Sequence, residues 1–126
     1  MRMESPLGRA RGLGSAKEGV GHWWAQRLTA IALVPLSLWF VISVIALLGA
    51  DHARFQAWLA TPGNTAMMVL LIIATFHHAQ LGVQVVIEDY VHDEAIKTAS
   101  LIALKLAAVA LGVFSVVAVL NVAMGG

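Results

Sequence analysis

Three apolar stretches of about 22 to 25 residues most constrain how this chain can fold. They run from Leu28 to Gly49, from Thr65 to Ile87 and from Thr98 to Val122, and Lys105 is the only lysine, arginine, aspartate or glutamate in them. About 20 helical residues cross a hydrocarbon core of roughly 30 Å, so each stretch is long enough to span a membrane. None alternates apolar and polar residues with period two, which a membrane β-barrel requires. The sequence therefore predicts an all-α membrane protein with three transmembrane helices.

The composition supports this assignment and excludes several functions. Hydrophobic residues make up 60% of the chain and charged residues 12%, too few charges to cover a soluble domain of 126 residues. The net charge of +1 argues against nucleic acid as a partner. The absence of cysteine excludes disulfides and thiolate-bound iron–sulfur clusters within this chain. A metal or redox centre held here must use histidine, methionine or oxygen ligands.

The basic residues predict the orientation. The N-terminal segment carries five of them, whereas residues 50–64 carry only Arg54. The positive-inside rule then places the N-terminus in the cytoplasm and the C-terminus on the outer side of the membrane. We expect residues 1–21 to form a cytoplasmic arm and residues 22–126 to form a three-helix membrane anchor domain. Because three short helices can hardly enclose a site, we expect them to pack with other membrane subunits into a helical bundle.

Two adjacent histidines interrupt the second span. At 100° per residue, His78 shares a stripe with Gly82 and Asp89, whereas His77 lies on a stripe about 100° away, so the two cannot address one ligand. His78 precedes Asp89 by eleven residues and therefore lies ~16 Å below the cytoplasmic end of its helix. An ionisable side chain at that depth is a candidate functional site. Haem-iron ligation and a hydrogen bond across a helix interface both account for it. For Lys105, snorkelling to the interface is the favoured interpretation.

Polar residues also gather where the first span begins and the second ends. We expect Arg27 and the pair Asp89-Tyr90 to lie at similar depth if the two helices are adjacent. An arginine there binds a carboxylate such as a haem propionate, and a tyrosine hydroxyl donates to a quinone carbonyl. The ordinary alternatives are headgroup contacts for Arg27 and the interfacial aromatic belt for Tyr90.

The segments "HWWAQRLTAIAL" (22–33) and "FHHAQLGVQVVIEDYVH" (76–92) resemble a known family. They are similar to the hydrophobic membrane-anchor subunit, also called the D or cytochrome b small subunit, of succinate dehydrogenase, respiratory complex II. The specific features are the histidine followed four residues later by glycine, the D-Y-V run, and the R-x-T-A-I-A start of the first helix. The doubled histidine resembles the alphaproteobacterial and mitochondrial branch.

This resemblance implies a set of roles. His78 matches the axial ligand of a haem b whose other ligand comes from a second anchor subunit of the cytochrome b556 type. Arg27 matches the arginine that meets the haem propionates, and His22 matches a nearby histidine less well, because its offset from the arginine differs by one residue. Tyr90 matches the tyrosine that hydrogen-bonds ubiquinone, with Asp89 as its acidic neighbour and a possible proton relay.

The resemblance also implies partners and a location. An iron–sulfur subunit and a flavoprotein subunit would carry out the succinate chemistry, and this chain would belong to the bacterial inner membrane as a multi-pass protein. Glu88 and His92 are further candidates for proton relay at the cytoplasmic face. The alternative is a haem-free membrane scaffold that docks a soluble redox enzyme. A subunit of another dihaem quinone oxidoreductase is a third option, but such proteins usually have more spans and several histidine pairs.

Overall fold

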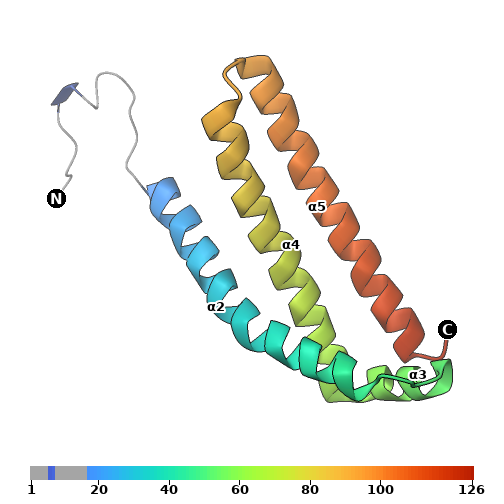
Figure 1. The fold of residues 1–126 in the computed structure, drawn as a ribbon. Helices are drawn as coiled ribbons and strands as arrows, with labels where there is room; N and C mark the ends of the chain where they lie inside the picture. The colour runs from blue at the N-terminus through green and yellow to red at the C-terminus, as the bar shows by residue number, and fades with distance from the viewer. Residues whose placement is uncertain (1–5, 8–16) are drawn as a thin grey trace.

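The computed structural model describes residues 6–7 and 17–126, which form helices and short connections with no strand among them. The elements in order are α2 (Lys17–Ala46), α3 (His52–Ala60), α4 (Pro62–Tyr90) and α5 (Glu94–Ala123). Figure 1 shows three long helices running alongside one another, with the short α3 across one end. The prediction of an all-α chain is confirmed for the described residues.

Among the described residues, three helices are long and apolar enough to cross a membrane: Gly19–Ala46 within α2, Pro62–Tyr90 and Glu94–Ala123. They contain 28, 29 and 30 residues, or ~42–45 Å by the helical rise, so their ends extend beyond a 30 Å hydrocarbon core. The predicted spans are therefore confirmed, but the helices are longer than the spans. The largest difference is at the start of α2, which begins at Lys17 inside the predicted arm. Apart from residues 6–7, the rest of that arm lies outside the described residues.

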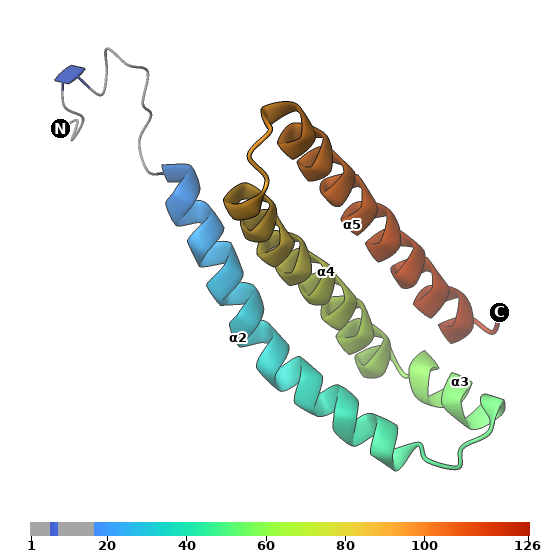
Figure 2. The ribbon, with the colours of Figure 1, turned by 45° about the horizontal axis from the view of Figure 1, so that its top comes forward.

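The helix α4 lies between the other two long helices. It packs against α2 on one side and against α5 on the other, and within the described chain α2 and α5 do not contact each other. Figures 1 and 2 show this order from two directions. The buried hydrophobic side chains of the described residues are correspondingly few: Leu36, Leu59, Leu81 and Val119. Most of the apolar surface of the described residues therefore faces outward, where lipid or another membrane subunit can cover it.

Local sequence signals set the ends of the helices. Gly49 has a positive φ of 80° in the turn after α2, a conformation that glycine adopts without strain. The side chain of Asp51 caps α3 by accepting a hydrogen bond from the Arg54 amide at 2.9 Å. The side chain of Asp93 caps α5 in the same way, accepting from the Ile96 amide at 3.0 Å. The chain reverses direction between α2 and α4, through α3, and again between α4 and α5, so consecutive long helices run antiparallel.

The helix α2 bows along its length, as both views show, and Pro35 lies inside it. Proline supplies no amide hydrogen, and its ring crowds the carbonyl of the preceding turn, which bends a helix at that point. The half of α2 before the proline is the half that carries the polar residues of the site.

Candidate functional site

His78 lies on the side of α4 that faces α2. Its Nδ1 is 3.0 Å from the hydroxyl oxygen of Thr29, and the imidazole is half-buried. Two side-chain polar atoms of the described residues are enclosed and lack a hydrogen-bond partner, His22 Nε2 and Gln26 Oε1. Nε2 of His78 is not among these enclosed atoms. The other nitrogen of His78, Nε2, makes no hydrogen bond to the described residues and is not fully enclosed by them.

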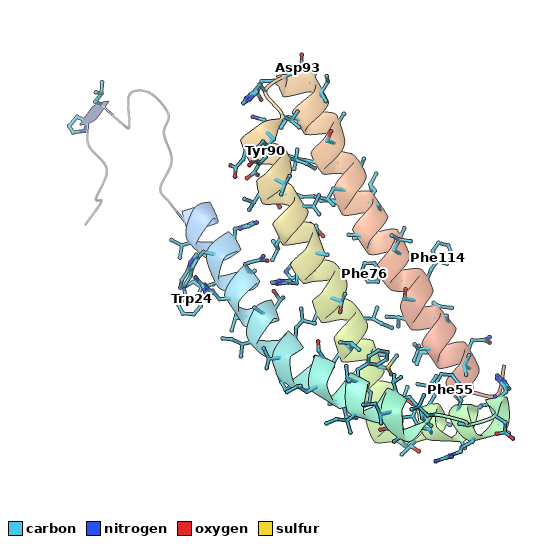
Figure 3. The ribbon with its side chains drawn as sticks, viewed as in Figure 1. Trp24, Phe55, Phe76, Tyr90, Asp93 and Phe114 are labelled. Carbon is cyan, nitrogen blue, oxygen red and sulfur yellow. The ribbon has the colours of Figure 1, made fainter. Side chains whose placement is uncertain are left out.

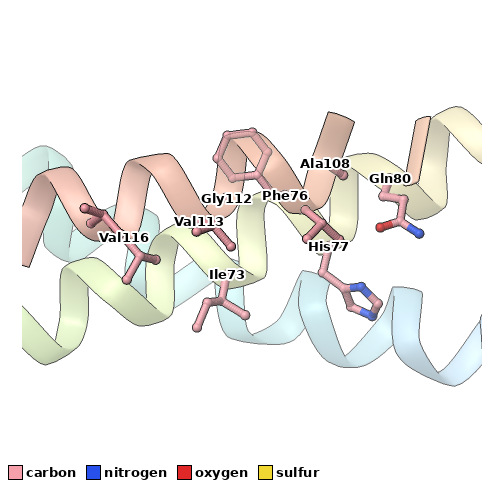
Figure 4. Close-up of a pocket in the computed structure, with 10 residues that line it drawn as sticks. Ile73, Phe76, His77, Gln80, Ala108, Gly112, Val113 and Val116 are labelled. Carbon is pink, nitrogen blue, oxygen red and sulfur yellow. The ribbon is translucent and has the colours of Figure 1, made fainter. Parts of the chain in front are cut away.

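His77 lies on a different side of the same helix. Its exposed side chain lines a mostly apolar groove of about 370 Å³ between α4 and α5, together with Gln80. Figure 4 shows this groove, in which Phe76 of α4 lies against Gly112 of α5. The prediction that the two histidines face different surroundings is confirmed. The groove is not predictable from the sequence, because it depends on how α5 packs against α4.

A polar seam follows the interface of α2 and α4. We define it as His22, Gln26 and Thr29 of α2 with His78 and Gly82 of α4. The α2 members are spaced by four and three residues, so they share one face of the helix. A Cβ on Gly82 would meet the Gln26 amide nitrogen at 3.8 Å, an ordinary contact distance. Gly82 therefore contributes its bare backbone to this seam, one helical turn from His78.

Gln26 and the hydroxyl of Thr29 were not singled out from the sequence. A polar spacing of i, i+4 and i+7 at the start of an apolar helix is the signal that identifies them. Enclosing His22 Nε2 and Gln26 Oε1 without partners costs about 1–3 kcal/mol per group. A hydrogen-bond partner from another subunit or a bound cofactor would remove this cost, as expected if the seam is part of a site shared between chains.

The contacts along the seam also fix the register of the two helices. Thr29 lies opposite His78, and Gln26 lies opposite Gly82. Arg27 is therefore level with residues 80–81, and Tyr90 lies about nine residues beyond that point, or ~14 Å along α4. The expectation that Arg27 and Asp89-Tyr90 lie at similar depth is wrong.

The reason for this error is the early start of α2. Because the helix begins at Lys17, Arg27 stands ten residues inside it rather than at its first turn. Its guanidinium lies over the ring of Trp23, with the carbon at 5.3 Å from the ring centroid. Arginine stacks on an aromatic face in this way while remaining exposed. Arg27 thus belongs to the His78 region of the chain and not to the Tyr90 region.

Tyr90 ends α4 and is strongly exposed, with 78% of its surface accessible. Figure 3 shows it near Asp93, at the opposite end of the molecule from Phe55. Asp89 and His92 are exposed beside it, and Glu88 accepts a hydrogen bond from the Gln84 side chain at 3.0 Å. The structure brings these groups to one end of the chain, where the described residues leave most of the surface of Tyr90 uncovered.

The described residues hold no group of three or more histidine, cysteine, aspartate or glutamate side chains suited to a metal ion. A haem places a smaller demand on one chain, because a single imidazole supplies one axial ligand. The residues present fit that demand. The Nε2 of His78 is open, Gly82 leaves bare backbone one turn away, and Arg27 is within about one turn in the helical register. Lys105 is exposed on α5 and takes no part in this arrangement.

The fold and the seam together define a class: a multi-pass helical membrane protein with an open imidazole midway along its central helix. Comparison with known proteins identifies the family. Residues 1–120 match the family of succinate dehydrogenase/fumarate reductase transmembrane subunits. The chain therefore belongs to this family and is a multi-pass protein of the bacterial inner membrane.

Individual relatives agree with this assignment. The chain is 39% identical over 111 residues, 88% of its length and 89% of the relative's, to the succinate dehydrogenase hydrophobic membrane anchor subunit of Rickettsia bellii. It is 34% identical over 90 residues, 71% of its length and 70% of the relative's, to the subunit of the same name from Paracoccus denitrificans. A succinate dehydrogenase membrane anchor subunit from Reclinomonas americana is 28% identical over 96 residues, 74% of this chain and 80% of that one. The family resemblance predicted from the two motifs is confirmed.

Proposed function

We propose that this membrane anchor subunit of succinate dehydrogenase binds haem b jointly with a second anchor subunit and contributes to the site where ubiquinone is reduced. The observation that carries the proposal is the open Nε2 of His78, on the central helix and twelve residues from its end. An imidazole so deep in a membrane is costly unless its lone pair is used. In the proposed orientation the N-terminus is cytoplasmic and the C-terminus periplasmic.

In the haem region, His78 would provide one ligand to the iron and the second anchor subunit would provide another. The broad exposed apolar faces of α2 and α4 support docking of such a subunit. Arg27 is exposed and close to His78 in the register, so its guanidinium is available to a propionate. His22 is a weaker candidate for the same contact, because its Nε2 is enclosed in the seam and only Nδ1 or a turned ring would reach outward. When bound, such a haem would supply one-electron storage.

In the quinone region, the hydroxyl of Tyr90 donates a hydrogen bond to a quinone carbonyl oxygen. This bond strengthens as negative charge develops on that oxygen during reduction. Asp89, with Glu88 and His92 nearby, passes protons from the cytoplasm to the reduced oxygen. The ~14 Å between the levels of Arg27 and Tyr90 argues for a cation from a partner subunit at this oxygen, in place of Arg27.

The succinate chemistry belongs to partner subunits. A flavoprotein subunit oxidises succinate, and an iron–sulfur subunit passes the electrons to the membrane. This chain has no cysteine to hold clusters. Its own contribution is to anchor the assembly, to orient an imidazole and to present a hydrogen-bond donor at the membrane surface.

Purification of the tagged chain in mild detergent tests the proposal. We expect three further subunits to co-elute, together with a reduced-minus-oxidised spectrum of the b type. A complex with the same subunits but no b-type spectrum would support the alternative, a haem-free scaffold that docks a soluble redox enzyme. Recovery of the chain without redox subunits would contradict both.

A further inference from the structure

The hydroxyl of Thr29 has three polar neighbours. Its oxygen lies 2.8 Å from the carbonyl oxygen of Ala25, 3.0 Å from that of Gln26 and 3.0 Å from Nδ1 of His78. A hydroxyl has one proton to donate and two lone pairs to accept with, and a carbonyl oxygen only accepts. When that proton is directed to a carbonyl of its own helix, as the 2.8 Å contact with Ala25 favours, a lone pair of Thr29 is left for His78.

This arrangement determines which nitrogen of His78 carries the proton. Thr29 then accepts, and Nδ1 donates, in the 3.0 Å contact that joins α4 to α2. In a neutral imidazole only one nitrogen is protonated, so the lone pair then resides on Nε2. That is the nitrogen that is open to a group from outside the chain.

We infer that Thr29 is a positioning residue for His78: by accepting from Nδ1 it selects the tautomer and orients the ring so that Nε2 is presented to a haem iron. The inference rests on the proposed haem role of His78. Ligating histidines commonly donate their other N–H to an acceptor, which fixes the ring and makes it a stronger ligand. Thr29 supplies that acceptor from a different helix, so the orientation of the His78 ring depends on the packing of α2 against α4.

The neighbouring histidine provides the contrast. Among the described residues His77 has no hydrogen-bond partner, and it lines the groove between α4 and α5. No contact of this part of the chain selects its tautomer. The hydrogen bond to Thr29 thus distinguishes the two histidines on structural grounds that are independent of motif matching.

The test compares Thr29→Val, which keeps the shape and deletes the hydroxyl, with Thr29→Ser, which keeps the acceptor. In the purified complex we expect Thr29→Val to release haem about 10- to 100-fold more readily to a haem-scavenging protein. We also expect its haem midpoint potential to rise, because a less basic imidazole stabilises ferric iron less. Thr29→Ser should keep the wild-type haem release and the wild-type midpoint potential. Ser43→Ala, which deletes a hydroxyl from a buried residue further along α2, is the control and should change neither.

The outcomes separate the inference from the function on which it rests. Wild-type haem content with unchanged retention and potential in Thr29→Val would overturn the positioning role alone. A wild-type complex without haem would overturn the proposed function and this inference together. Equal losses in Thr29→Val and Ser43→Ala would reduce the role of Thr29 to general packing and so overturn it.

Discussion

Removing the hydroxyl of Tyr90 should slow quinone reduction without disturbing the fold. Tyr90 is 78% exposed and makes no side-chain hydrogen bond among the described residues, so Tyr90→Phe leaves no buried group unpaired. Exposed substitutions of this kind change stability by less than about 0.5 kcal/mol. Any large loss of activity in this variant therefore reports on a contact outside the chain.

The magnitude follows from the proposed contact. A hydrogen bond to a charged acceptor contributes about 1.5–3 kcal/mol. If Tyr90 donates to a quinone oxygen that gains negative charge, its loss slows the quinone reaction by about 10- to 150-fold. Electron transfer from succinate to a soluble artificial acceptor does not use this contact and should keep its wild-type rate.

The assay is the ratio of these two rates in the same membrane preparation. The ratio cancels differences in expression and assembly, and the haem spectrum provides a second check on assembly. Glu94→Gln, an exposed change four residues away at a position with no assigned role in quinone reduction, tests whether any alteration of this end of the chain has the same effect. An unchanged ratio in Tyr90→Phe, or an equal fall of both rates, would refute the assigned role.

Two further predictions concern the interface of α2 with α4 and the start of α5. Gly82→Ala should assemble with bound haem, because its Cβ meets the Gln26 side chain at an ordinary 3.8 Å, whereas Gly82→Leu must displace that side chain and should lose haem. Equal haem content in both variants would contradict this geometry. Asp93→Ala should cost about 1 kcal/mol of stability by removing the cap on the Ile96 amide, and Asp93→Asn should not. Thermal unfolding of the purified complex measures the difference, and identical curves for the two variants would contradict it.

The parts of the fold that the sequence predicts are those governed by the bilayer. A span must be long and free of charge, so Leu28–Gly49 and the two later stretches are evident from composition. The extent of a helix is different, because its hydrogen bonds continue into the headgroup region, where composition no longer distinguishes helix from loop. This is why the start of α2 at Lys17 was missed.

For the site, the sequence predicts which residues share a face of one helix but not which residues of two helices meet. Helical periodicity separated His78 from His77, because a 100° rotation per residue holds whatever surrounds the helix. The register of α2 against α4 depends on interhelical packing, which periodicity within one helix does not encode. The partnership of Thr29 with His78 was therefore not foreseen, and Arg27 was placed at the depth of Tyr90.

The roles of His78, Arg27, His22, Tyr90 and Asp89 stay predictions, supported by position and by family. The residues that depend on other chains are the hardest to assign from this one. Tyr90 is the clearest example, since it is strongly exposed where a quinone pocket would enclose it. Partner subunits must supply the remaining walls.

The central claim is that the open nitrogen of His78 binds haem iron. The most direct measurement is the reduced-minus-oxidised absorbance spectrum of the purified complex in two matched variants, His78→Ala and His77→Ala. We predict that the b-type bands disappear in His78→Ala and persist in His77→Ala, with the same subunits present in both. Bands that persist in His78→Ala, or that disappear only in His77→Ala, would contradict the account.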